Sequence, residues 1–317
     1  MNYRRLGKTG LKVSELSLGS WVTYGGQVGD EAAKVCMVAA YDAGVNFFDG
    51  AEVYAKGEAE RSMGRVLKQV GWRRESLVLS TKLFWGGEGP NDVGLSHKHV
   101  LEGFHAALKR WQVDYLDLAF CHRPDPNTPI EETVRAFDIL IKQGKLFYWG
   151  TSEWSADDIV AAINVARERG LTPPVMEQPQ YSLLARARFE KEYATLLNDG
   201  YGSTIWSPLA SGVLSGKYDS GVPEGSRFAQ QSYAWLKDKM VTTEIITKVK
   251  QLEPIAKELG VTRAQLALAW CLKNPHVSTV ITGATRPEQV TENMNALDVV
   301  EKLTPELMKR LDALFPA

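Results

Sequence analysis

Short apolar runs of β-strand character recur along the chain, and a longer segment with helical periodicity follows each of them. This alternation is typical of repeated βα units, in which the strands form a parallel sheet. The predicted strands are 45–49, 77–82, 115–122, 146–152, 175–178, 204–207 and 277–281, and a shorter one ends near Leu18. Eight such strands predict an α/β fold of the (β/α)8 class, a TIM barrel.

Helix start signals lie between the predicted strands. Two segments match the capping-box pattern, Thr128-Pro129-Ile130-Glu131 and Thr262-Arg263-Ala264-Gln265, and the first has Pro at the opening helical position. Short polar side chains also stand where three further helices should begin, and we expect Asp30, Ser155 and Thr304 to cap them.

The two ends of the chain add elements to the predicted barrel. Residues 3–13 hold Gly7-Lys8-Thr9-Gly10 between short β-like runs, which predicts a hairpin that closes the bottom of the barrel. Residues 304–314 predict an extra C-terminal helix. No linker, composition shift or short repeat divides the chain, so residues 1–317 predict one barrel domain. The least regular segment, 208–238, is long enough to be a functional or disordered loop.

Composition and charge limit the classes of partner. With 317 residues, 44% hydrophobic and 24% charged, the chain can bury a large core. Its 37 Lys and Arg nearly balance 38 Asp and Glu, so no broad field favours nucleic acid. Three scattered cysteines suit neither a disulfide framework nor a zinc site. No leader-like or membrane-spanning run is present, so we expect a cytoplasmic protein without direct membrane insertion.

Polar residues close six of the predicted strands. In a (β/α)8 barrel the active site lies at the carboxyl ends of the strands, so chemistry is expected there. One such residue alone is most simply a loop residue hydrated by water, but six in series favour a site. The six residues are Asp49, Lys82, His122, Ser152, Gln178 and Ser207.

Tyr54, on the loop after the second predicted strand, is the candidate general acid. A phenol with the ordinary pKa of about 10 donates a proton poorly near neutrality, and a nearby ammonium would lower that pKa. Lys82 can supply the ammonium, and Asp49 can pair with it. His122 can hydrogen-bond a substrate oxygen. These four groups are the parts needed to protonate a carbonyl oxygen while hydride reaches its carbon.

The sequence resembles the aldo-keto reductases over essentially its whole length. The similar segments are Asn46-Phe47-Phe48-Asp49 with Tyr54 and Gly57-Glu58-Ala59-Glu60, then Ser80-Thr81-Lys82, Cys121-His122-Arg123 and Gly150-Thr151-Ser152. Within that family it is most similar to the branch that contains the β subunits of voltage-gated potassium channels and their bacterial relatives. Residues 19–27, 123–129, 206–212 and 215–218 carry this second similarity.

The resemblance implies reduction of a small aldehyde or ketone by NADPH, with Tyr54 as the acid, Lys82 and Asp49 tuning it, and His122 orienting the substrate. It implies that Ser152 and Gln178 hold the nicotinamide carboxamide. The implied cofactor-binding residues are Ser20, Trp21, Gln27, Asp49, Ser152, Gln178, Trp206, Ser207, Pro208, Leu209, Ser211, Lys217, Arg227, Gly283, Thr285, Gln289, Glu292 and Asn293. The expected substrate-binding residues are Trp21, Tyr24, Tyr54, Phe84, Trp85 and His122, and their aromatic character suggests a hydrophobic or aromatic aldehyde.

Two departures from the family pattern affect these expectations. Many aldo-keto reductases grip the 2′-phosphate with a Lys-Ser pair and a later Arg, where this chain has Gly283-Ala284 and Gln289. The resemblance to the channel-subunit branch implies that Lys217 and Arg227 bind the phosphate instead and favour NADPH over NADH. The channel subunits carry Asn in place of His122, so its presence here favours a competent enzyme. By analogy with the same branch, we expect a homo-oligomer.

Other classes of function remain open at this stage. The protein could be an NADP(H)-binding, redox-sensing subunit of a membrane channel with little turnover. The complete set of four candidate catalytic residues and the expected lack of an extension before the barrel count against this. A metal-dependent hydrolase would need clustered His and carboxylate ligands. A Rossmann fold would need a glycine pattern that residues 87–92 do not complete, and residues 212–218 match a phosphate loop imperfectly.

Two clusters of polar residues are interpreted as hydrated surface. His97 and His99 are expected at a solvated helix end and not as metal ligands. Glu58, Glu60 and Arg61 are expected on the wet face of a helix.

Overall fold

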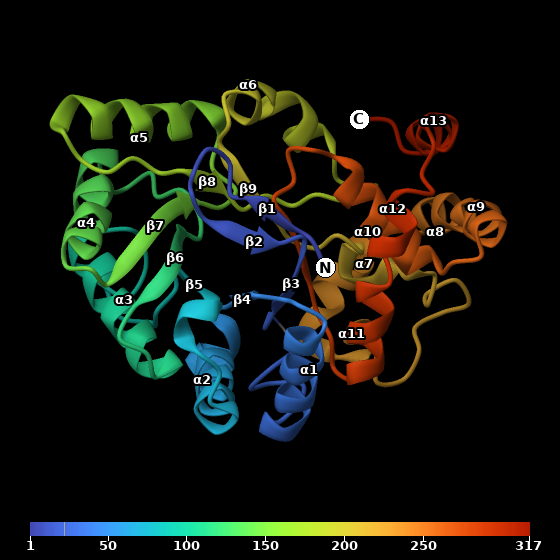
Figure 1. The fold of residues 1–317 in the computed structure, drawn as a ribbon, viewed down its shortest axis with the longest axis horizontal. Helices are drawn as coiled ribbons and strands as arrows, with labels where there is room; N and C mark the ends of the chain where they lie inside the picture. Colours follow the sequence, from blue (N-terminus) through green and yellow to red (C-terminus); the bar gives the residue numbers. More distant parts are fainter. Residues whose placement is uncertain (22) are drawn as a thin grey trace.

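The computed structural model describes residues 1–21 and 23–317, so Val22, within the segment 19–27 that carries the family resemblance, lies outside the described residues. Eight strands form a closed parallel barrel in the order β10-β3-β4-β5-β6-β7-β8-β9 (Figure 1). Their bounds are β3 Leu16–Gly19, β4 Phe47–Asp49, β5 Val78–Leu83, β6 Leu116–Cys121, β7 Leu146–Thr151, β8 Met176–Glu177, β9 Gly202–Ile205 and β10 Thr279–Thr282. The predicted (β/α)8 class is confirmed.

Helices surround the barrel in Figure 1. They are α1 Asp30–Asp42, α2 Glu58–Val70, α3 His97–Trp111, α4 Ile130–Lys142, α5 Ala156–Arg169, α6 Ala194–Asn198, α7 Ala234–Met240, α8 Thr243–Lys250, α9 Leu252–Leu259, α10 Arg263–Lys273, α11 Pro287–Met294, α12 Leu297–Val300 and α13 Pro305–Leu314. The extra C-terminal helix expected over 304–314 is therefore confirmed as α13. The irregular segment 208–238 contains the short helical turns η4 Ala210–Ser215, η5 Arg227–Ala229 and η6 Gln231–Tyr233 and the start of α7.

One predicted strand is displaced along the chain. The prediction was 204–207, but β9 runs from Gly202 to Ile205. Ser207 has a φ of 55°, in the left-handed region, so the backbone has left the extended conformation there. All the predicted strands, this one included, match an observed strand within two residues at either end.

The N-terminal hairpin closes the bottom of the barrel, as predicted. Strand β1, Tyr3–Arg5, pairs antiparallel with β2, Lys12–Ser14, and Figure 1 shows the pair lying across one end of the barrel. Leu6 and Val13 are fully buried and pack against side chains from the barrel interior. Those interior side chains are Phe47, Val78, Leu118, Phe120, Met176 and Ile281.

The barrel interior changes from apolar at the hairpin end to polar at the other end. Alternate residues of a strand face the same side, so the interior positions can be followed along each strand. On β4 the apolar Phe47 is followed by Asp49, and on β5 Val78 is followed by Lys82. The polar side chains are thus collected at the carboxyl ends of the strands, where a barrel places its active site.

Helix capping agrees with the sequence at three positions and differs at one box. Ser155 and Thr304 cap α5 and α13, and Thr262 with Gln265 forms a complete capping box on α10. The box predicted at residues 128–131 is wrong, because Pro129 is the N-cap of α4 and no side chain caps it. The Thr128 hydroxyl donates to the Asp125 carboxylate instead, at 2.7 Å.

The expected cap at Asp30 is also wrong. Asp30 is the first residue of α1, and Gly29 takes the N-cap position. The Asp30 carboxylate instead accepts from Arg65 Nε at 2.6 Å and from the Ser62 hydroxyl at 2.7 Å. The Asp30 carboxylate therefore bonds to the charged guanidinium of Arg65 on the neighbouring helix α2 and not to a backbone N–H of its own helix.

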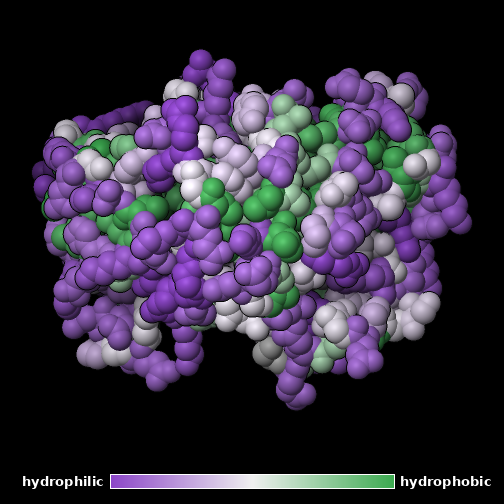
Figure 2. All heavy atoms as spheres, turned by 60° about the horizontal axis from the view of Figure 1, so that its bottom comes forward, coloured by the Kyte–Doolittle hydropathy of each residue, from purple (hydrophilic) through white to green (hydrophobic). Residues whose placement is uncertain are grey.

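Hydrophilic side chains dominate the face shown in Figure 2, and the hydrophobic ones form smaller groups among them. Within the described residues, no helix is both long enough and apolar enough to cross a membrane.

Leu6→Ala tests the contribution of the hairpin. We expect the free energy of unfolding to fall by about 2–5 kcal/mol, because a buried leucine leaves a cavity in a closed barrel end. Urea denaturation followed by circular dichroism measures this loss. Val35→Ala is the control, because Val35 is 45% exposed and its loss should change stability by less than about 0.5 kcal/mol. Equal effects of the two changes would contradict the assigned role.

Candidate active site

A buried ion pair lies at the centre of the polar end of the barrel. Lys82 Nζ lies 2.5 Å from Asp49 Oδ2 and donates a second bond to the Gly50 carbonyl at 2.9 Å. Both side chains are almost fully buried. Burial disfavours the Lys82 ammonium, but the charge and hydrogen bond of Asp49 outweigh this and raise the pKa of Lys82. Lys82 is therefore a fixed positive charge at neutral pH.

Tyr54 lies directly against this ammonium. Lys82 Nζ is 4.7 Å from the centre of the Tyr54 ring. Tyr54 begins the turn η1, Tyr54–Gly57, in which Ala55, Lys56 and Gly57 all have left-handed backbones with φ of 49°, 54° and 83°. Three such residues in succession are uncommon and fix the direction in which the loop leaves β4.

The expected effect of Lys82 on Tyr54 is present but does not dominate. Burial raises the pKa of Tyr54 above its ordinary value, and the Lys82 ammonium opposes that rise. The phenol is consequently protonated at neutral pH, which is the form a general acid needs.

His122 follows β6 and lies beside Tyr54. The centres of the two rings are 5.7 Å apart and the rings are nearly perpendicular. The His122 ring also packs against Trp85, with ring centres 5.0 Å apart. Burial and the charges of Lys82 and Arg123 hold the pKa of His122 well below its ordinary value, so the imidazole is neutral. Its Nδ1 is buried without a partner among the described residues.

Two further predicted residues are joined to the ion pair by hydrogen bonds. Gln178 Nε2 donates to Asp49 Oδ1 at 3.2 Å, and the Ser152 hydroxyl donates to the Gln178 carbonyl at 2.8 Å. The Ser20 hydroxyl donates to the Asp49 carbonyl at 3.0 Å. The structure thus brings Ser20, Asp49, Lys82, Ser152 and Gln178 into one hydrogen-bonded group.

Trp21 and Trp206 form an aromatic corner next to that group. Their rings are 6.1 Å apart in an edge-to-face arrangement, and the Arg227 guanidinium lies 5.0 Å from the centre of the Trp21 ring. Arg227 comes from η5, about two hundred residues after Trp21, so the irregular segment folds back over the barrel end. Residues 206 and 227, both expected at the cofactor, therefore meet at Trp21.

The segment after Trp206 has an unusual backbone. Ser207, Ala210 and Ser211 have φ of 55°, 48° and 59°, which non-glycine residues rarely adopt. The Ser211 N–H donates to the Ser207 hydroxyl oxygen at 3.3 Å and helps to hold this shape. Strained conformations of this kind cluster at ligand-binding segments. Pro208 and Leu209 lie within the same turn.

Beside this turn, Lys217 lies close enough to Arg227 and Arg286 for their charges to act on it, and the sequence predicted only Lys217 and Arg227 at the cofactor. The pKa of Lys217 is lowered by burial and by the nearby charges of Arg227 and Arg286. Among the described residues neither Lys217 nor Arg227 forms an ion pair with a carboxylate, and Arg286 has only a distant one, 3.9 Å from Glu288. Gly212 makes room for Lys217, because a Cβ there would lie 2.5 Å from Lys217 Cε. We call Lys217, Arg227 and Arg286 the cationic group.

The last five of the implied cofactor-binding residues, from Gly283 to Asn293, lie on the turn after β10 and on α11. Gln289 Oε1 accepts from the Thr285 N–H at 2.8 Å and from its hydroxyl at 3.1 Å. Gly283 is exposed, Glu292 is half-buried and Asn293 is buried. Arg286, the N-cap residue of α11, connects this stretch to the cationic group.

The structure does not bring Tyr24 to the other substrate-binding candidates. Tyr24 is 1% exposed and lies in the main hydrophobic core, and its pKa is raised by burial and by its neighbour Cys36 on α1. Phe84 and Trp85 pack on each other with ring centres 4.8 Å apart, on the same side as His122. Gln27 is half-buried in the turn after Thr23.

The interpretation of His99 as a solvated helix end is wrong. His99 is 5% exposed on α3, and its Nε2 lies 2.9 Å from Glu52 Oε1. The same Glu52 oxygen accepts from the Phe84 N–H at 2.6 Å, so the pair anchors the chain that carries Trp85. Burial works against protonation of His99, but the bond to Glu52 raises its pKa overall.

The wet-face interpretation is wrong for Glu60 as well. Glu60 on α2 is fully buried, and it accepts hydrogen bonds from the Thr81 hydroxyl, Arg110 Nε and Trp111 Nε1. Helical periodicity places Glu60 on one side of α2, but only the packing of α2 against α3 reveals that this side is covered. Glu58 and Arg61 remain at least partly exposed, as expected.

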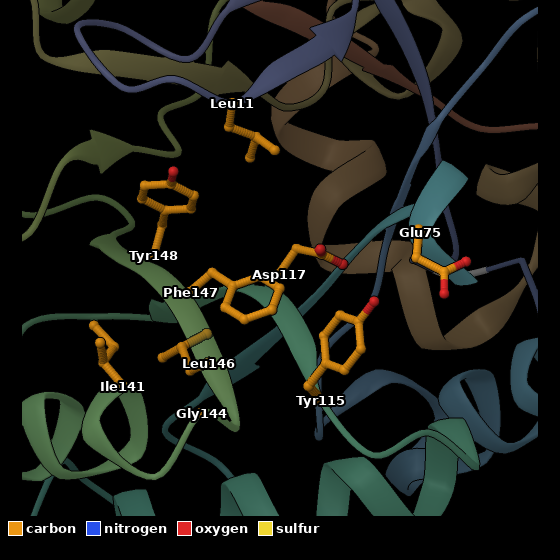
Figure 3. A pocket seen from close by; sticks show the side chains of 9 residues that line it. All are labelled: Leu11, Glu75, Tyr115, Asp117, Ile141, Gly144, Leu146, Phe147 and Tyr148. Carbon is orange, nitrogen blue, oxygen red and sulfur yellow. The ribbon is translucent and has the colours of Figure 1, made fainter. Parts of the chain in front are cut away.

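A hollow lies at the opposite end of the barrel from these residues. It measures about 630 Å³ and is lined from the amino ends of the strands and the hairpin by Leu11, Glu75, Tyr115, Asp117, Ile141, Gly144, Leu146, Phe147 and Tyr148 (Figure 3). None of the candidate catalytic residues borders it. Its size therefore does not bear on the chemistry at the polar end.

The fold is a (β/α)8 barrel with a polar site at the carboxyl ends of its strands, and comparison with known proteins gives its family. The chain belongs to the aldo/keto reductase family, whose model, described as "Aldo/keto reductase family", matches residues 15–315. Members of this family are oxidoreductases that typically bind NAD(P)H. The family resemblance drawn from the sequence is thus confirmed.

Two similar proteins indicate the branch. A protein of Oryza sativa subsp. japonica named "Probable voltage-gated potassium channel subunit beta" is 54% identical over 316 residues, which cover 99% of this chain and 96% of the relative. A protein of Arabidopsis thaliana with the same name is 54% identical over 317 residues, covering 99% of this chain and 97% of the relative. The expected similarity to the channel-subunit branch is confirmed.

Glu177 provides a test of the electrostatics behind the site. Burial raises the pKa of this carboxyl to about 8, and its Oε1 has no partner within the described residues. Because the folded protein keeps this proton to a higher pH than the unfolded chain, its contribution to stability is complete below about pH 4.3 and is lost as the pH rises towards 8. Thermal unfolding of Glu177→Gln should therefore show a weaker loss of stability as the pH rises over this range, by on the order of 5 kcal/mol. Glu168→Gln, at an exposed position, should keep the wild-type pH dependence.

Proposed function

We propose that this protein reduces aldehydes or ketones to alcohols with NADPH, using Tyr54 as the general acid. The observation that carries the proposal is the contact between the Lys82 ammonium, held by Asp49, and the Tyr54 ring, with a neutral His122 alongside. A protonated phenol next to a fixed positive charge can release its proton when charge develops on a carbonyl oxygen, because the ammonium stabilises the phenolate that remains.

The residues present fit a nicotinamide dinucleotide. Within the cationic group, Lys217 and Arg227 pair with no carboxylate among the described residues and the ion pair of Arg286 is long, so the group offers positive charge to a 2′-phosphate. Trp21 and Trp206 offer aromatic surface between this group and Asp49. When bound, the cofactor supplies the hydride that reaches the carbonyl carbon. Ser152 and Gln178 are the residues proposed for its carboxamide.

His122 and Tyr54 are proposed to receive the substrate oxygen together. A neutral imidazole can donate one hydrogen bond without placing a second full charge next to Lys82, and His122 Nδ1 has no partner within the part of the chain that the structure describes. The phenol donates the second bond and then the proton. This arrangement orients the carbonyl and polarises it at the same time.

Aromatic side chains suggest the class of substrate. Phe84 and Trp85 pack beside His122, and Trp21 lies on the cofactor side of the site. These rings favour an aldehyde with a hydrophobic or aromatic part.

A second function deserves a test because of the names of the relatives. Both similar proteins are named as probable channel β subunits, so this chain could bind NADP(H) and assemble, as a homo-oligomer, on a membrane channel with little turnover. The arrangement of Tyr54, Lys82 and His122 favours catalysis over this alternative. Tight NADPH binding without consumption of any carbonyl compound would favour the regulatory function.

Tyr54→Phe tests the assignment of the acid. NADPH consumption with a panel of aromatic and aliphatic aldehydes should fall by at least about a hundredfold, because the phenol supplies the transferred proton. NADPH binding, measured by quenching of tryptophan fluorescence, should stay unchanged. Tyr148→Phe, at the opposite end of the barrel, is the matched control and should keep full activity. An active Tyr54→Phe variant would show that another group is the acid.

Charge reversal in the cationic group tests the cofactor preference. Lys217→Glu or Arg227→Glu should weaken NADPH binding by about tenfold or more while changing NADH binding far less, because only NADPH carries the 2′-phosphate. Lys239→Glu makes the same change of net charge at an exposed position on α7 and serves as the control. An equal loss for both cofactors would exclude this group as the phosphate site.

A further inference from the structure

Glu153 joins three segments of the barrel end that are far apart in sequence. It follows Ser152 after β7 and has a left-handed backbone with φ of 59°, which is uncommon for glutamate. Its Oε1 accepts from the Gln180 N–H at 2.7 Å and from Trp206 Nε1 at 3.1 Å. One carboxylate oxygen therefore links the ends of β7, β8 and β9.

The other oxygen of Glu153 is held by an arginine. Arg188 Nη1 donates to Glu153 Oε2 at 2.8 Å, while Arg188 Nη2 donates to the carbonyls of Glu153 at 3.3 Å and Trp154 at 2.9 Å. Three bonds from a single guanidinium fix both the backbone and the carboxylate of Glu153. This accounts for the persistence of its unfavourable φ.

Trp206 transmits this anchoring towards the site. The Glu153 carboxylate accepts a hydrogen bond from the indole N–H. The Trp206 ring therefore cannot rotate about its Cβ–Cγ bond without losing this hydrogen bond. The ring in turn meets Trp21 edge to face, and Trp21 lies under the Arg227 guanidinium. The contacts therefore run without a gap from Arg188 and Glu153 to a member of the cationic group.

We propose that Glu153 is a positioning residue for the cofactor, which holds the Trp206 indole, and through it Trp21 and Arg227, in the arrangement that binds NADPH. This inference rests on the proposed function of the same site. Glu153 acts through Trp206 and needs no contact with the cofactor itself. Its negative charge is matched by Arg188, so it does not repel a phosphate.

A carboxylate suits this position better than a neutral acceptor. Its two oxygens serve different partners, with Oε1 facing two N–H donors and Oε2 facing a guanidinium. Glutamine could keep the Oε1 contacts but would turn an NH2 group towards Arg188. Alanine would remove all of them.

A double-mutant cycle between Glu153→Ala and Trp206→Phe tests the proposal, with the dissociation constant of NADPH as the readout. Glu153→Ala should weaken NADPH binding by about tenfold, the size expected for a charged hydrogen bond that orders a ligand-binding ring. In the Trp206→Phe background, which has no indole N–H, the same change should cost about threefold or less, since only the Gln180 contact remains to be lost. A purely structural role would give equal losses in both backgrounds and would overturn the proposal.

Two further variants keep the test decisive. Glu153→Gln, which keeps the acceptor for Trp206, should bind NADPH within about threefold of the wild type, and a loss as large as that of Glu153→Ala would also overturn the proposal. If Glu153→Ala does not fold, Trp206→Phe alone carries the test, because it removes the indole N–H that Glu153 holds; NADPH binding should then weaken by about tenfold, and binding within about threefold of the wild type would contradict the inference. Glu192→Gln removes the other carboxylate that pairs with Arg188 and should leave NADPH binding unchanged.

The outcome separates this inference from the function on which it rests. If the wild-type protein binds no NADPH, the proposed function fails. If it binds NADPH, and Glu153→Ala binds equally well, only the positioning role is wrong.

Discussion

The buried pair of Lys82 and Asp49 is the interaction on which the polar end of the barrel depends. Moving two charges out of water costs several kcal/mol for each, and their attraction compensates only if the remaining polar atoms are also satisfied. Here they are, because the Gly50 carbonyl accepts from Lys82 and both Ser80 and Gln178 donate to Asp49. The pair therefore fixes the relative heights of β4, β5 and β8 at this end, while the hairpin fills the other end with apolar side chains.

Burial and a single ammonium together set the protonation of Tyr54 and His122. The Lys82 ammonium is kept charged by Asp49, it opposes the rise in the pKa of Tyr54 that burial causes, and it helps to keep His122 neutral. The effects on Tyr54 and His122 both come from the same positive charge, which stabilises a phenolate and destabilises an imidazolium. An acid and a neutral hydrogen-bond donor can thus lie side by side near neutral pH.

The sequence predicted the barrel and the members of this central group because both follow from strand periodicity. A strand fixes which residues face inwards, and a barrel fixes where its strands end, so Asp49, Lys82 and His122 could be placed together. Glu52 with His99, and Glu60 with Arg110, could not be predicted in this way. Each pair joins a loop or helix to the neighbouring helix, and which helical face is covered depends on packing that periodicity alone does not determine. Arg286 was missed for the same reason, because its approach to Lys217 requires the long segment after β9 to fold back.

The pairing of carboxylates elsewhere in the barrel explains why the charge of the cationic group is not neutralised. Glu60 and Glu153 each accept from neutral donors and also meet a cationic partner, respectively Arg110 and Arg188, while Glu52 accepts from Phe84 N–H and pairs with His99. Because these carboxylates are paired with partners inside the protein, they add little negative potential at the polar end of the barrel. Lys217 and Arg227 form no such pair among the described residues, although the chain as a whole has a net charge of -1. The separation of paired carboxylates from unpaired cations, and not the overall charge, is what would make one corner of this nearly neutral protein attractive to a phosphate.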